Sequence, residues 1–359
     1  MSSESSKISA MNVSRRRFLS TTGGATLAVP LFPNITTAAK AGSKPAIVGE
    51  GAFQYECHHG WGAVPEHIRW ADTHGVAIDG EGFVYIKHRG GGKEPMDTIA
   101  VFEPGTGKFV RSFGKEYFGG GHGIDIREEE GEEYLYLSDT RNGIVAKTTL
   151  KGDQIWTKSF PVDCGFYGEE QRFSPTNIAF APDGGFYVAD GYGSSYIHQY
   201  DKNDNWVRTW GGKGSRIGAM STPHSIWLDD RPGRDVSLVV ADRANARLQY
   251  FSLDGIHLGF VDAVSFPADF DTQGEIMLVP DLHARISLFD KENQVVTHLG
   301  YSQEWTDQAL GDGFKMRRTP AMWEDGRFVH PHDACFDTDG NIYVAEWVAS
   351  GRVSFLKKV

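Results

Sequence analysis

The sequence predicts an all-β fold, a six-bladed β-propeller preceded by a cleavable signal segment, and three observations predict it. One strand–turn–strand pattern recurs six times between residues 74 and 346. Glycine is abundant, with 43 residues in a chain of 359, and 12% of the residues are aromatic. Such a composition is typical of many short strands joined by tight turns. Because all-β folds of this length often form one domain, we expect a single propeller over residues 42–359.

Residues 1–41 are expected to form an export signal. Ser14–Leu19 holds three consecutive arginines, and a mildly apolar run follows at Thr21–Phe32. The tripeptide Ala39–Ala41 then fits a cleavage site with alanine at both outer positions. This order resembles a twin-arginine signal, and the apolar run is too short for a membrane-spanning helix. We therefore expect the twin-arginine export machinery as a partner, a periplasmic or secreted location, and no stable membrane span.

The six repeats have the layout of propeller blades. In each copy an apolar strand is followed by a polar turn and by a strand rich in Val and Tyr. Most copies continue into two more strand-like runs, which gives four strands and about 40 to 65 residues per unit, as in propeller blades. First strands are expected at residues 74–79, 122–126, 176–180, 224–228, 268–271 and 332–336, and second strands at 83–86, 134–137, 186–190, 238–242, 276–279 and 342–346.

The two ends of the chain are expected to close the ring together. The last copy has only one further strand-like run, at residues 352–356. Residues 53–57 can supply the missing outer strand, and this pairing would leave no gap in the ring. The long irregular interval 296–328 is predicted to be an inserted loop, such as a lid, over one face.

Charge and cysteine content argue against two classes of function. The formal charge is −11, and without residues 1–41 it becomes −15, from 31 basic and 46 acidic residues. A nucleic-acid partner requires a basic surface, so none is expected. Cys57, Cys164 and Cys335 form no CxxC pair, which argues against a cysteine zinc site or a thiol redox motif and leaves one disulfide open.

Histidines recur at the residue that opens the first strand. In the order of the six copies this residue is His74, His122, Thr176, His224, Ala268 and His332. First strands line the central channel of a propeller, and alternate blades lie about a third of a turn apart. His122, His224 and His332 are therefore expected to face one point on the axis. Three imidazoles there would hold zinc and leave one position open for water or substrate, with His74 as an additional candidate.

The ends of the second strands are expected to surround the same point, because each second strand returns to the face that the first strand leaves. Arg89, Tyr192 and Arg243 lie at these ends. Taken singly, each arginine is as readily a solvated surface charge. Two guanidinium groups beside a metal cation repel it unless an anion joins them, and arginine binds carboxylates through two parallel hydrogen bonds. The residues thus predict a small-molecule or peptide substrate that carries a carboxylate.

This pattern resembles peptidyl-α-hydroxyglycine α-amidating lyase, an NHL-repeat propeller that is the second catalytic domain of the peptide-amidating enzymes. The resemblance is closest over Phe173–Phe251, which contains the runs SPTN, VADGY, PHS and VADRANAR. The tripeptides His88–Gly90 and Pro331–Asp333, together with His122-Gly123, extend it over most of the propeller. Single repeats of this type are unspecific, whereas this set in this order is fairly specific.

The resemblance implies a lyase that cleaves the C–N bond of an α-hydroxyglycine amide to an amide and glyoxylate. It implies zinc on the three histidines that the repeat register selects, His122, His224 and His332. Tyr192 would take the proton of the substrate hydroxyl, while Arg89 and Arg243 would hold the carboxylate and stabilise developing negative charge. A calcium ion in the family would fall on one carboxylate and two backbone carbonyls, those of Asp333, Val76 and Ile124.

The chain departs from the family at several positions, and other functions stay open. His330 replaces a methionine near the last zinc histidine, His74 replaces a small residue, and Gly193 and Tyr250 take the places of disulfide cysteines. One alternative is a non-catalytic exported propeller that binds a protein or ligand on its top face. Another is a propeller hydrolase or lactonase, which would use calcium held by acidic and Asn ligands. A six-bladed fold alone does not separate these functions.

Overall fold

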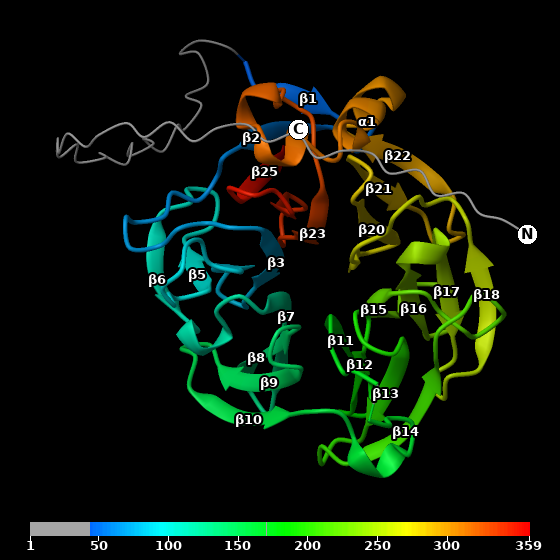
Figure 1. Cartoon of the computed structure of the whole chain (residues 1–359). Helices are drawn as coiled ribbons and strands as arrows, with labels where there is room; N and C mark the ends of the chain where they lie inside the picture. The colour runs from blue at the N-terminus through cyan, green and yellow to red at the C-terminus, as the bar shows by residue number, and fades with distance from the viewer. Residues whose placement is uncertain (1–43, 170) are drawn as a thin grey trace, which may run out of the picture. The chain divides into compact units, whose positions relative to one another are not determined.

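Six antiparallel sheets surround one axis in the computed structural model, which describes residues 44–169 and 171–359 (Figure 1). Five of these sheets have four strands and the sixth has five. The six-bladed β-propeller predicted from the repeats is therefore confirmed. The predicted export signal, residues 1–41, lies outside the described residues, so the signal and its boundary stay predictions.

Five of the blades are runs of four consecutive strands, numbered from the axis outward. Blade one comprises β3 (Thr73–Ile78), β4 (Val84–His88), β5 (Ile99–Phe102) and β6 (Phe109–Phe113), and blade two comprises β7 (Gly121–Glu129), β8 (Glu132–Asp139), β9 (Ile144–Thr149) and β10 (Gln154–Lys158). Blade three comprises β11 (Asn177–Phe180), β12 (Phe186–Ala189), β13 (Tyr196–Tyr200) and β14 (Trp206–Gly211). Blade four comprises β15 (Pro223–Asp229), β16 (Ser237–Asp242), β17 (Arg247–Phe251) and β18 (His257–Val261), and blade five comprises β19 (Asp271–Gln273), β20 (Ile276–Asp281), β21 (Arg285–Phe289) and β22 (Val295–Leu299).

The sixth blade joins the two ends of the described chain. It consists of β23 (Pro331–Phe336), β24 (Ile342–Glu346), β25 (Arg352–Lys358), β2 (Tyr55–His59) and β1 (Ala46–Val48). The outer strand predicted at residues 53–57 is confirmed, because Cys57 of β2 lies opposite Leu356 of β25 in an antiparallel pair. The fifth strand, β1, was not predicted. All three cysteines are free, so the chain uses strand pairing rather than a disulfide to close the ring.

The inserted segment packs on the propeller. It begins later than predicted, because β22 continues to Leu299, and it contains the helix α1 (Gln303–Leu310) and the 3-10 turns η4 (Met316–Arg318) and η5 (Pro320–Met322). Trp305 and Met316 are buried in one cluster with Ala284 of blade five and Val348 of blade six. Three further 3-10 turns lie in loops: η1 (Lys115–Tyr117), η2 (Val162–Cys164) and η3 (Arg243–Asn245). Among the described residues, no helix is long and apolar enough to cross a membrane.

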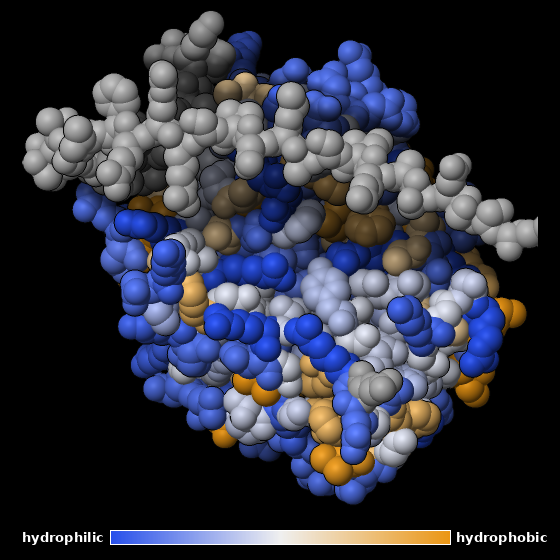
Figure 2. Space-filling model, in the orientation of Figure 1, coloured by the Kyte–Doolittle hydropathy of each residue, from blue (hydrophilic) through white to orange (hydrophobic). Residues whose placement is uncertain are grey.

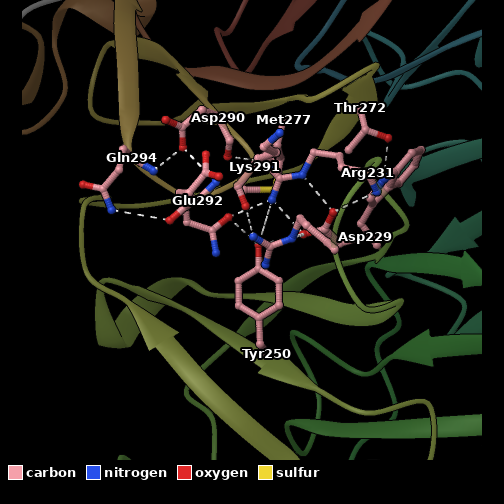
Figure 3. Close-up of polar contacts among 12 residues, drawn as sticks. Asp229, Arg231, Tyr250, Thr272, Met277, Asp290, Lys291, Glu292 and Gln294 are labelled. Atoms are coloured by element: carbon pink, nitrogen blue, oxygen red, sulfur yellow. Dashed lines mark hydrogen bonds and ion pairs between the residues drawn. The ribbon is translucent and has the colours of Figure 1, made fainter.

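A buried ion pair lies inside blade four, next to blade five (Figure 3). The Arg231 guanidinium lies 2.7 Å from the Asp229 carboxylate, and neither side chain is exposed. Tyr250 donates its hydroxyl to the same carboxylate at 3.0 Å. Arg231 also donates to the backbone oxygen of Asp290 in blade five at 2.6 Å, so this polar cluster links the two blades.

Candidate metal centre and active site

Three histidines face one another at the axis. His122, His224 and His332 lie near the starts of β7, β15 and β23, in blades two, four and six. Their ring centroids are 4.6, 4.7 and 4.8 Å apart, and all three side chains are buried. The ladder register shifts at each of these positions, and such a β-bulge re-aims a side chain relative to its strand. The structure therefore brings together the three histidines that the repeat register selected.

Each of the three imidazoles is hydrogen-bonded to the backbone of the blade that follows its own around the ring. In each case Nδ1 lies 2.7 Å from the carbonyl oxygen of the residue that opens the next blade: Thr176 for His122, Ala268 for His224 and His74 for His332. Because a carbonyl only accepts, each Nδ1 carries the proton and each neutral Nε2 keeps its lone pair as an acceptor. Hydrogen bonds of this kind orient metal-ligating histidines in proteins.

Burial keeps these imidazoles neutral. It lowers the pKa of His122 and of His224 well below its ordinary value, with smaller contributions from nearby histidines and arginines. It lowers the pKa of His332 to about 3, and Arg243 adds to this effect. Neutral imidazole is the form that binds a metal ion. Three neutral imidazoles with unprotonated Nε2 atoms are a donor set that fits zinc.

His74 joins this cluster as a fourth imidazole. Its Nδ1 lies 3.1 Å from Nε2 of His332, and its own Nε2 is buried without a hydrogen-bond partner. One ligand atom from each of His74, His122 and His332 can be chosen so that all three lie within 4.8 Å of one another. Two possible ligand triplets therefore share His122 and His332 and differ in whether His74 or His224 completes them. Only the triplet with His224 has the same Nδ1 anchor at all three members.

His330, which the sequence places two residues before His332 and which was a further candidate for the metal site, points elsewhere. Its Nδ1 lies 2.7 Å from the backbone oxygen of Leu282. Its ring contacts the aromatic side chains of Phe314 and Trp347, with centroids 5.5 and 5.7 Å away. The structure therefore places His330 beside the inserted segment rather than in the cluster of axial histidines.

Tyr192 lies directly against the axial histidines. Its hydroxyl is 2.9 Å from Nε2 of His224 and 3.3 Å from Nε2 of His122. Nη1 of Arg243 donates to the same hydroxyl at 3.2 Å, and the Arg243 guanidinium also lies over the Tyr192 ring. Arg89 and Tyr192 line one cavity of about 350 Å³. Among the described residues, neither Arg89 nor Arg243 makes an ion pair with a carboxylate.

The carboxylate of the predicted calcium site is buried next to the histidines. Oδ2 of Asp333 accepts a hydrogen bond from the backbone N–H of Val76 at 2.8 Å, and Ile124 is buried on β7. Burial raises the pKa of Asp333 well above its usual value, and the negative charges of Asp269 and Asp125 add to this effect.

Three further acids lie at or beside the first strands of blades two and five, and none of them was predicted as a site residue: Asp125 on β7, Asp271 at the start of β19, and Asp269 two residues before it. Burial raises the pKa of Asp269 and of Asp271 to about 7. A signal for them was present in the repeats. Asp269 takes the position of Asp333, one residue after the opening residue, and Asp125 and Asp271 lie three residues after it. The channel thus has a histidine level followed by acidic levels.

Solved structures with a similar fold include two lyases. The chain matches the structure of a streptogramin B lyase with a TM-score of 0.55 at 10% identity, over 86% of this chain and 99% of that chain. It matches virginiamycin B lyase from Staphylococcus aureus with a TM-score of 0.53 at 13% identity, over 85% of this chain and 100% of that one. At such low identity these likenesses concern the fold.

Sequence relatives point to one family. The chain is 26% identical over 333 residues to peptidylglycine alpha-amidating monooxygenase of Rattus norvegicus, and 27% identical over 298 residues to peptidyl-alpha-hydroxyglycine alpha-amidating lyase 1 of Drosophila melanogaster. These matches cover 83% and 77% of this chain but only 32% and 51% of the relatives. No family model matches the chain. The predicted resemblance is confirmed: this propeller is a homologue of the peptidyl-α-hydroxyglycine α-amidating lyases.

Proposed function

We propose that the protein is a zinc-dependent lyase that cleaves the C–N bond of an α-hydroxyglycine amide. The products are glyoxylate and an amide. In this reaction the hydroxyl oxygen loses its proton and forms the aldehyde C=O bond, the C–N bond breaks, and the amide nitrogen gains a proton. One observation carries the proposal: the Tyr192 hydroxyl lies between two of three axial histidines whose Nδ1 atoms are anchored in the same way.

His122, His224 and His332 would hold the zinc ion through Nε2. Bound zinc supplies Lewis acidity, which polarises an oxygen and lowers its proton affinity. The burial of the three rings and their anchoring by backbone carbonyls keep them neutral and fixed before any ion binds. His74 would then lie beside the ligands, and its Nδ1 contact with Nε2 of His332 would give way to the zinc ion.

Tyr192, Arg89 and Arg243 would supply the proton acceptor and the binding site for the carboxylate. Tyr192 would accept the proton of the substrate hydroxyl as the phenolate. Arg243, which contacts the Tyr192 hydroxyl, would stabilise that negative charge. Arg89 and Arg243 would bind the carboxylate that becomes part of glyoxylate, because neither guanidinium is used by a carboxylate of the described chain. A substrate carboxylate would therefore complete the charge balance of this site.

The proposal includes a second cation and an export route. Asp333, with the backbone carbonyls of Val76 and Ile124, would hold calcium, and the neighbouring buried acids favour a cation there because their charges repel one another. The Ser14–Leu19 stretch supports export by the twin-arginine machinery to the periplasm or the medium. Zinc would then be the catalytic metal and calcium the structural metal of an exported enzyme.

The test is release of glyoxylate from α-hydroxyhippurate by the purified mature protein. We expect glyoxylate and benzamide in equal amounts, loss of activity after treatment with a zinc chelator, and recovery when zinc is added back. A zinc-loaded protein that releases no glyoxylate from this or other carbinolamides would reject the lyase and favour a binding propeller.

A further inference from the structure

The cavity beside Tyr192 is lined by more arginines than one carboxylate requires. In addition to Arg89, the side chains of Arg141 and Arg172 reach it, together with Gly119, Thr140 and Ser174. Its volume of about 350 Å³ is in the range of sites for small ligands. Neither Arg141 nor Arg172 belongs to the residues that the resemblance assigns to catalysis.

Both additional guanidinium groups are tethered at the cavity wall. Nη1 of Arg141 donates to the backbone oxygen of Phe118 at 3.0 Å, and Nη2 of Arg172 donates to the backbone oxygen of Thr140 at 3.0 Å. Gly119 makes room for Arg141, because a Cβ atom there would lie 2.7 Å from Nη1. A guanidinium has five N–H donors, so each tether leaves most of them free for a ligand.

The charges of these arginines are uncompensated within the described chain. Neither Arg141 nor Arg172 makes an ion pair with a described carboxylate, although several other arginines do so, for example Arg127, Arg247 and Arg352. Both residues are exposed. Guanidinium groups that line one cavity repel one another, and a bound anion removes that repulsion. Hydrophilic side chains gather near the propeller axis on the face seen in Figure 2.

A short series of contacts connects these arginines to the catalytic candidates. Ser174 donates its hydroxyl to the Thr140 oxygen that also accepts from Arg172, and the Tyr192 N–H donates to the Ser174 oxygen at 3.2 Å. On the other side, the Gly119 N–H donates to the Arg89 oxygen at 2.9 Å. A substrate carboxylate at Arg89 and Arg243 would therefore leave the acyl part of the same molecule to face Arg141 and Arg172.

We propose that Arg141 and Arg172 form an anion-binding subsite that selects α-hydroxyglycine amides whose acyl group carries its own carboxylate. This inference rests on the proposed lyase function, since it concerns the other end of the same substrate. The subsite accounts for two tethered guanidinium groups that make no ion pair within the described chain. It defines the substrate as a dianion, with one carboxylate on the glycine-derived carbon and one on the acyl chain.

Binding of a non-reactive probe tests the subsite without turnover. N-Glutarylglycine lacks the hydroxyl group and cannot be cleaved, and N-glutaramoylglycine replaces its distal carboxylate by an amide of the same shape. By calorimetry on the metal-loaded protein at low salt, we expect the glutaryl compound to bind about tenfold more tightly, the effect of one charge-assisted hydrogen bond. Arg141→Gln, Arg172→Gln and the double variant should bring this ratio towards one, and Arg208→Gln, an exposed arginine on β14, should not.

Turnover of the corresponding α-hydroxyglycine compounds separates the two proposals. A glutaryl preference in binding that needs Arg141 and Arg172, without glyoxylate release, would support the subsite and reject the lyase. Glyoxylate release from both compounds with equal kcat/KM, unchanged in the double variant, would support the lyase and overturn the subsite. A preference that persists in the double variant would also overturn it.

Discussion

Tyr192 and a metal ion require the same nitrogen lone pairs. The Nδ1 protons of His122 and His224 are used by backbone carbonyls, so their Nε2 atoms are acceptors. The Tyr192 hydroxyl contacts both of these atoms, and it can donate to only one of them at a time. Once a metal occupies both lone pairs, the hydroxyl has no acceptor among these histidines and is left for the substrate. The geometry therefore couples metal binding to release of the proposed base.

Replacing Tyr192 by Phe tests this coupling. Tyr192→Phe removes the base, so kcat for glyoxylate release should fall by about 100-fold or more, the usual contribution of a positioned proton acceptor. It also removes a competitor for Nε2, so zinc should bind at least as tightly as in the unaltered protein. Competition with a chromogenic chelator measures this affinity. Undiminished turnover in this variant would show that Tyr192 is not the base.

At the scale of single elements, buried polar contacts fix the blades relative to one another. The Asp229–Arg231 pair belongs to blade four, and Arg231 also reaches blade five through the Asp290 carbonyl. Arg231 holds the pKa of Asp229 below its usual value, although burial acts in the opposite direction. The stabilisation from this pair is therefore present above about pH 4, the pKa of an unfolded Asp, and is lost as pH falls below it.

Arg231→Met should destabilise the propeller by about 3 kcal/mol at pH 7, because it leaves the Asp229 carboxylate buried with an incomplete set of partners. Urea unfolding followed by fluorescence measures the change. As a matched control, Arg208→Met breaks an exposed pair with Asp254 and should change the free energy of unfolding by about 0.5 kcal/mol or less. Equal effects of the two substitutions would show that the buried cluster contributes no more than a surface pair.

At the scale of the whole molecule, the side chains of the central channel change along the axis, from the histidines at the strand starts to acids one and three residues later. Asp125, Asp269, Asp271 and Asp333 come from blades two, five and six, and burial raises the pKa of each. For Asp269 and Asp271 the folded pKa of about 7 exceeds the ordinary value of 3.8. The stability that their protonated forms contribute is therefore complete below about pH 4 and is lost as pH rises through 7. A bound cation would offset that loss.

In the presence of a chelator, the free energy of unfolding should accordingly decline between pH 5 and pH 8. Asp125→Asn should raise stability at pH 8 by about 1 kcal/mol, the equivalent of roughly one pKa unit, because it removes one of the repelling charges. Oδ2 of Asp125 has no hydrogen-bond partner to lose. Glu128→Gln, at an exposed position on the same strand, is the control. A steeper decline in Asp125→Asn than in the control would contradict this account.

The repeat pattern was sufficient to predict the blades, the closing strand and the three axial histidines, because residues at one repeat position occupy equivalent places around the axis. It did not predict the contact of His74 with His332, which depends on the distance between neighbouring blades at a bulge. It also did not predict that His330 turns towards Leu282. His330 lies just before β23, whose register is irregular at its start, so its distance from His332 along the chain does not fix the direction of its side chain. Asp125, Asp269 and Asp271 were not predicted, because they lie one or three residues after the opening residue of their repeats.

The most direct test is the zinc content of His224→Ala and His74→Ala beside the unaltered mature protein. His224 belongs only to the triplet of alternate blades, whereas His74 belongs only to the tighter group with His122 and His332. We predict that His224→Ala loses zinc and glyoxylate release together, while His74→Ala keeps its zinc, with circular dichroism confirming that both variants fold. Full zinc in His224→Ala and loss of zinc in His74→Ala would contradict the account and place the metal on His74, His122 and His332.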